Sequence, residues 1–88
     1  MTHVNVKIFG EVQGVFFRHS ARLKAREIGI TGFVKNEPDG AVYMEAEGDE
    51  KKLGRFLEWC QHGSESAKVE TVESSPGNVK GFSDFVIK

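Results

Sequence analysis

The spacing of hydrophobic residues changes several times along this chain, and the order of these changes limits the folds available to it. Residues 4 to 9 (VNVKIF) alternate between apolar and other side chains, which predicts a strand that ends near Gly10. A helical spacing follows, and Gly29 is suited to ending that helix. The apolar positions on one face of this helix are Phe17, Ala21, Ala25 and Ile28.

The remaining elements are predicted in the same way. Ile30–Lys35 and Ala41–Glu47 flank the turn-forming segment NEPDG, which predicts a hairpin. A second helix opens at Asp49 and closes at Gly63, with Leu53, Phe56, Leu57 and Cys60 on its apolar face. Further strands are expected at Ala67–Glu73 and Phe82–Ile87, separated by a turn at residues 74–78. The order βαββαβ plus a short C-terminal strand predicts an α+β, ferredoxin-like split βαβ sandwich, with two helices on one face of an antiparallel sheet.

Composition narrows the class of protein. We expect the 88 residues to form one domain, residues 1–88, because a chain of this length has room for a single core. The one cysteine excludes an intramolecular disulfide, and neither a signal peptide nor a membrane span is recognisable. We therefore expect a cytoplasmic monomer that does not bind membranes.

Charge is distributed unevenly. Residues 1–36 hold six basic and two acidic residues, whereas residues 37–88 hold six basic and eleven acidic ones. The basic N-terminal part would attract a small anion. The net charge of −1 argues against binding to a nucleic-acid backbone, which normally requires a strongly basic surface.

The segment GEVQGVFFR joins the first strand to the first helix and places a cation in the first turn of that helix. The free N–H groups and the dipole of a helix start favour anions, so a cation there is unfavourable unless an anion lies beside it. A glycine-containing loop can aim its N–H groups into a concavity that binds phosphate. The groups that would bind such a phosphate are the guanidinium of Arg18 and the backbone N–H groups of Gln13, Gly14, Val15, Phe16 and Phe17. The same residues fit equally well a tight turn with the arginine in solvent.

Asn36 ends the predicted second strand within GFVKNEPDG. Its side-chain amide both donates and accepts hydrogen bonds, so it is able to orient a water molecule. An asparagine before a hairpin turn more often bonds to its own backbone. Taken by itself, Asn36 therefore fits a structural role better than a catalytic one.

Together, GEVQGVFFR, GFVKNEPDGAV and the following EGDEKKLGRFLEW resemble the acylphosphatase family over essentially the whole chain. The resemblance implies that Arg18 binds phosphate, that Asn36 positions the attacking water, and that residues 13–17 form the phosphate cradle. It implies hydrolysis of the carboxyl-phosphate bond of small-molecule acyl phosphates to a carboxylate and inorganic phosphate, with no metal ion and no cofactor. Lys35 and Phe33 stand where the family frequently has arginine and tryptophan, which leaves the substrate preference open.

Two other functions are compatible with parts of the sequence. An RNA-binding module of this architecture would use aromatic residues on the open sheet face, such as Phe9 and Tyr43, but the full aromatic motif is missing. A non-catalytic anion-binding domain would keep the cradle without turnover. Cys60 is expected in the core rather than as a nucleophile, and no metal-ligand spacing joins the histidines His3, His19 and His62.

Overall fold

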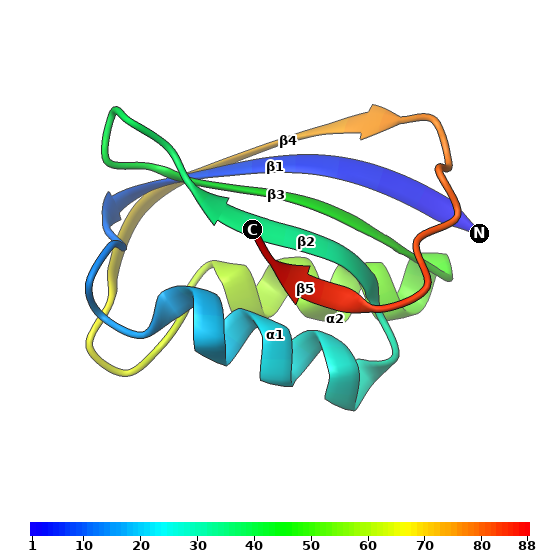
Figure 1. Cartoon of the computed structure of the whole chain (residues 1–88), viewed down its shortest axis with the longest axis horizontal. Helices are drawn as coiled ribbons and strands as arrows, with labels where there is room; N and C mark the ends of the chain where they lie inside the picture. The colour runs from blue at the N-terminus through cyan, green and yellow to red at the C-terminus, as the bar shows by residue number, and fades with distance from the viewer.

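The computed structural model describes residues 1–88 and has two helices packed on one face of a five-stranded sheet (Figure 1). The elements in chain order are β1 (Thr2–Glu11), α1 (Phe17–Ile28), β2 (Thr31–Asn36), β3 (Val42–Gly48), α2 (Glu50–Cys60), β4 (Lys68–Gly77) and β5 (Phe85–Ile87). The strand order across the sheet is β4-β1-β3-β2-β5. The ferredoxin-like α+β sandwich expected from the sequence is confirmed.

Two details of the sheet differ from the prediction. β4 continues through Ser74 to Gly77, where the sequence predicted a turn, and Pro76 pairs opposite Val4 of β1. A proline is tolerated there because β4 is an edge strand, whose outer side needs no N–H donor. β5 is shorter than predicted and runs parallel to β2, so the sheet is mixed rather than purely antiparallel.

The alternation of side chains places the core between the sheet and the helices. β1 directs Val6 and Ile8 toward the helices, and β3 directs Val42 and Met44 to the same side. The predicted apolar face of α1 is fully represented among the buried residues of that helix, and Leu53, Phe56 and Cys60 are buried on α2.

α1 ends and α2 begins where the sequence indicated, whereas α2 ends at Cys60 rather than at the predicted Gly63. Gly29 adopts a left-handed φ of 95° and caps the C-terminus of α1, donating its N–H to Ala25 O. Asp49 caps α2 by accepting a hydrogen bond from the N–H of Lys52 at 3.0 Å.

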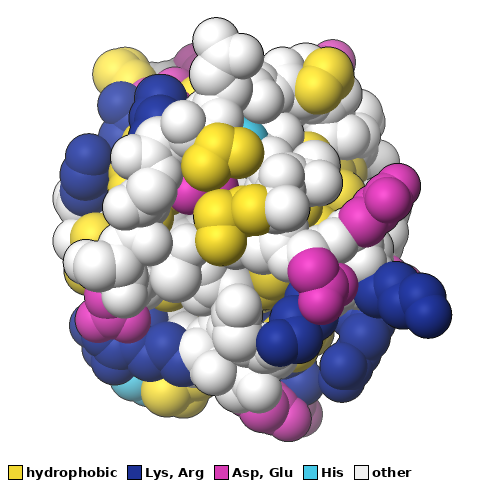
Figure 2. Space-filling view, turned by 90° about the vertical axis from the view of Figure 1, so that its right-hand side faces the viewer, with side chains coloured by type: hydrophobic (Ala, Val, Ile, Leu, Met, Phe, Trp, Pro, Cys, Tyr) yellow, Lys and Arg dark blue, Asp and Glu magenta, His cyan; other side chains and the backbone are white.

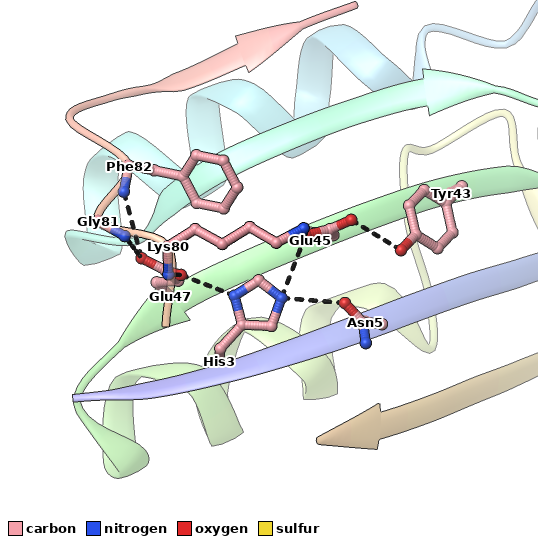
Figure 3. A network of polar contacts seen from close by, with 8 residues as sticks. All are labelled: His3, Asn5, Tyr43, Glu45, Glu47, Lys80, Gly81 and Phe82. Carbon is pink, nitrogen blue, oxygen red and sulfur yellow. Dashed lines mark hydrogen bonds and ion pairs between the residues drawn. The ribbon is translucent and has the colours of Figure 1, made fainter. Parts of the chain in front are cut away.

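The other face of the sheet carries a buried polar network (Figure 3). The ring of His3 lies between Glu47 and Asn5, with Nδ1 2.7 Å from Glu47 Oε2 and Nε2 2.9 Å from Asn5 Oδ1. The Glu47 carboxylate also accepts hydrogen bonds from the backbone N–H groups of Lys80, Gly81 and Phe82. It therefore fastens the β4–β5 connection to the sheet.

This connection lies at the end of the molecule opposite the β1–α1 loop (Figure 1). On the face at that end, hydrophobic side chains form small separate groups among acidic and basic ones (Figure 2). Neither helix is long and apolar enough to cross a bilayer.

Candidate active site

The loop between β1 and α1 combines two left-handed residues with unpaired backbone donors. Gly14 has a φ of 73° and Phe16 a φ of 62°, and Phe16 is the only residue other than glycine with a positive φ. None of the N–H groups of residues 13–16 donates a hydrogen bond to the protein. Phe16 occupies the N-cap position of α1 without a side-chain cap, and the first turn contains no acidic residue. The loop thus presents free donors at a helix N-terminus, the arrangement that binds anions.

Three contacts hold this loop in place. The side chain of Gln13 donates through Nε2 to the carbonyls of Glu37 and Ala41, at 2.8 and 2.9 Å, and so ties the loop to the β2–β3 hairpin. Ser64 donates from its hydroxyl to Val15 O at 2.7 Å, which ties it to the α2–β4 connection. The ring of Phe17 is buried in the core. The loop and the hairpin accordingly lie at the same end of the sheet (Figure 1).

An open cavity of about 320 Å³ adjoins this loop. It is lined by Val12, Gly14, Phe16, Phe17, Arg18, His19 and Ile87. The guanidinium of Arg18 takes part in none of the ion pairs of the structure. A cation without an acidic partner, beside free N–H groups, favours an anionic ligand.

Asn36 does not line this cavity, but its side chain lies on the helix-facing side of the sheet, as does that of Val34 beside the cavity residue Ile87. In the β2–β3 register, Asn36 pairs with Val42, so it shares the helix-facing side of the sheet with Val34. Val34 in turn pairs with Ile87, which lines the cavity. The Oδ1 atom of Asn36 is buried and has no hydrogen-bond partner in the protein. Its amide therefore keeps an unused acceptor at the end of β2, next to Glu37, whose carbonyl accepts a hydrogen bond from Gln13.

Of the other candidate residues, Cys60 lies in the core, as the sequence analysis expected. Cys60 is buried, and burial raises the pKa of its thiol to about 12, which keeps it protonated and unreactive. His19 is exposed but lines the cavity beside Arg18. Neither His3 nor His62 lines the cavity, and no group of three or more histidine, cysteine or acidic side chains is arranged to hold a metal ion.

Sequence reasoning missed two features of this region. It treated Gln13 only as a backbone donor, whereas its side chain joins the two candidate segments. It also gave no sign that Phe16 adopts a left-handed conformation, because aromatic residues rarely do so. The polarity of Gln13 within a largely apolar stretch was the available signal for the first feature.

The fold and this loop define a class: a small α+β protein with unpaired backbone N–H donors where its first strand meets its first helix. The acylphosphatase family model matches residues 4–87, which is nearly the whole chain. An acylphosphatase from Methylococcus capsulatus is 42% identical over 99% of this chain and 96% of its own length.

Solved structures agree with this comparison. An acylphosphatase from Bacillus subtilis has a TM-score of 0.97 and 34% identity, covering 100% of this chain and 99% of that one. One from Coxiella burnetii has a TM-score of 0.95 and 39% identity, covering 99% and 92%. The chain belongs to the acylphosphatase family, and its activity is hydrolysis of the carboxyl-phosphate bond of acyl phosphates.

Proposed function

We propose that the β1–α1 loop and Arg18 bind the phosphoryl group of an acyl phosphate and that Asn36 orients the water that attacks it. The observation that carries this proposal is the set of unpaired N–H groups at residues 13–16 beside a guanidinium with no acidic partner. A phosphoryl group placed there would accept hydrogen bonds from the loop and from the planar fork of Arg18. Negative charge on its non-bridging oxygens would be compensated from both sides.

The reaction needs little more than this. The oxygen of water forms a bond to phosphorus while the bond from phosphorus to the carboxyl oxygen breaks, giving a carboxylate and dihydrogen phosphate. The carboxylate is a weak base and leaves without a general acid. Phosphoryl transfer depends mainly on positioning and charge stabilisation, so a backbone cradle, Arg18 and Asn36 suffice without a metal ion.

Asn36 supplies the positioning. Its Oδ1 has no partner within the protein and would accept one hydrogen from the water, leaving a lone pair directed at phosphorus. The Gln13 side chain binds the hairpin directly after Asn36, and thereby fixes the distance between the cradle and the water site. The proposed site thus spans the β1–α1 loop and the β2–β3 hairpin, which the side chain of Gln13 joins.

The test is hydrolysis of benzoyl phosphate and acetyl phosphate by the wild type, Arg18→Ala, Arg18→Lys and Asn36→Ala. We expect Arg18→Ala and Asn36→Ala to lower kcat/KM on the order of 10²-fold or more, because each removes a transition-state contact. Arg18→Lys keeps the charge but loses the planar fork, so it should fall between the wild type and Arg18→Ala. Arg55→Ala and Asn78→Ala, which change exposed residues of the same types away from the loop, are the matched controls.

Equal turnover by the wild type and both alanine variants would refute the residue assignment. A wild type that binds phosphate but does not hydrolyse either substrate would instead be the non-catalytic anion-binding domain. Activity should persist in EDTA, and inorganic phosphate should compete with substrate. We further propose that residues 1–88 act as one domain and as a cytoplasmic monomer. Size-exclusion chromatography tests the oligomeric state.

A further inference from the structure

Phe16 is unfavourably placed in two independent ways. Its backbone is left-handed, a conformation that costs a bulky residue on the order of 1 kcal/mol or more. Its side chain is 77% exposed, although the neighbouring Phe17 is buried in the core. Backbone strain of this kind persists at positions where the geometry serves a ligand.

The surroundings of Phe16 indicate what such a ligand would be. Of the large hydrophobic side chains that are exposed, Phe16 alone lines the cavity beside the β1–α1 loop. Val12 and Ile87 give that cavity further apolar wall, while Arg18 and the loop N–H groups supply its polar part. A cavity lined by both a cation and apolar side chains fits a ligand that is anionic at one end and apolar at the other.

An acyl phosphate has this form. A single oxygen separates phosphorus from the acyl carbon, so a phosphoryl group held by the loop and Arg18 leaves the acyl group beside the apolar part of the same cavity. The side chain of Phe16 lines this cavity and is largely exposed. Aromatic groups gain from stacking or edge contacts with such a ring beyond the burial of surface alone.

We propose that the Phe16 ring contacts the acyl group of the substrate and makes the protein prefer acyl phosphates with an aromatic or bulky apolar acyl group over acetyl phosphate. This inference rests on the proposed function, because it takes the phosphoryl group to be held by the β1–α1 loop and Arg18. Phe16 thus sets specificity through its side chain.

The test uses two phosphonates that cannot be hydrolysed, phenacylphosphonate and acetonylphosphonate, which differ only in a phenyl or a methyl group beyond the carbonyl. Their dissociation constants are measured by calorimetry on the wild type, Phe16→Asn, Phe16→Tyr and Leu23→Ala. Asparagine tolerates the left-handed conformation, so Phe16→Asn removes the ring and keeps the loop. Leu23 is 53% exposed on α1 and does not line the cavity, which makes Leu23→Ala the matched control.

We expect the wild type to bind phenacylphosphonate roughly 3- to 10-fold more tightly than acetonylphosphonate, the size of one aromatic contact. Phe16→Asn should abolish this preference, whereas Phe16→Tyr and Leu23→Ala should keep it. Equal binding of the two ligands by the wild type, or an unchanged preference in Phe16→Asn, overturns the inference. Failure of the proposed function is seen separately, as selective binding of phenacylphosphonate without hydrolysis of benzoyl phosphate.

Discussion

Replacing Glu47 with glutamine should destabilise the protein strongly, although the two side chains have nearly the same shape. Glu47 is fully buried, and both of its oxygens are used. Oε2 accepts from His3 Nδ1 and from the N–H of Lys80, while Oε1 accepts from the N–H groups of Gly81 and Phe82 (Figure 3). In either orientation, the NH₂ group of a glutamine would face at least one backbone N–H.

The size of the effect follows from these bonds. A buried N–H left without an acceptor costs about 1–3 kcal/mol, and hydrogen bonds to a charged acceptor are stronger than those to a neutral one. Losing one acceptor and the charge at the others should therefore lower the free energy of unfolding by about 2–4 kcal/mol at pH 7. For a domain of this size, that corresponds to a fall in Tm of roughly 10–20 °C.

The loss should depend on pH in a defined direction. Burial raises the pKa of the Glu47 carboxyl, but hydrogen bonds from the Lys80 N–H, His3 and the N–H groups of Phe82 and Gly81 outweigh it and hold the pKa below its ordinary value of 4.5. A carboxyl whose pKa falls on folding stabilises the native state fully above about 4.5, and this stabilisation is lost as the pH falls through the folded-state pKa. The difference between wild type and Glu47→Gln should therefore narrow below pH 4.5.

Urea unfolding followed by circular dichroism at pH 7, 5 and 3.5 measures this. Glu70→Gln is the control, because Glu70 is exposed on β4 and has no polar side-chain partner. A loss below about 1 kcal/mol for Glu47→Gln at pH 7, or one that stays constant at low pH, would show that the carboxylate does not hold the β4–β5 connection.

Three further experiments test other parts of the structure. Gly32→Ala should destabilise by about 3 kcal/mol or more, because its Cβ would overlap the carbonyl of Glu45, whereas Gly54→Ala in the open interior of α2 should stabilise by about 0.5–1 kcal/mol; thermal unfolding compares the two. Gln13→Leu removes two hydrogen bonds between the β1–α1 loop and the β2–β3 hairpin. The free energy of unfolding should therefore fall by about 1–3 kcal/mol, and kcat/KM for benzoyl phosphate should fall with it. Finding both values unchanged would contradict this prediction. The Cys60 thiol, with its pKa raised to about 12 by burial, should react with a thiol reagent at pH 8 only after urea is added.

The elements that face the core were predictable from the sequence. Alternation identified the buried face of β1, and helical spacing identified the buried sides of α1 and α2, because burial against one layer requires those periods. The end of β4 was not predictable, since Ser74 to Gly77 are turn formers by composition and are exposed on an edge strand. Pairing with β1 overrides that composition. The parallel pairing of β5 rests on three residues, too few to carry a pattern.

The candidate site, like the fold, was predictable only in part from the sequence. Gly14 was predicted to give the loop backbone freedom, and its φ of 73° is a left-handed conformation that glycine adopts without cost. Phe16 adopts it against its own preference, and no rule based on propensity would place it there. The Glu47 network was also missed, since it joins β1, β3 and the β4–β5 connection through contacts distant in sequence.

What distinguishes the two ends of this molecule is how each treats its backbone donors. At the β4–β5 connection, three successive N–H groups donate to the carboxylate of Glu47, so they are not available to a ligand. At the β1–α1 loop, the N–H groups of residues 13–16 have no acceptor in the protein, yet Gln13 and Ser64 hold the loop from both sides. Free donors on a fixed loop are preorganised for an anion, because binding then requires little reordering of the protein. We propose that the substrate supplies at the β1–α1 loop the anion that Glu47 supplies at the other end.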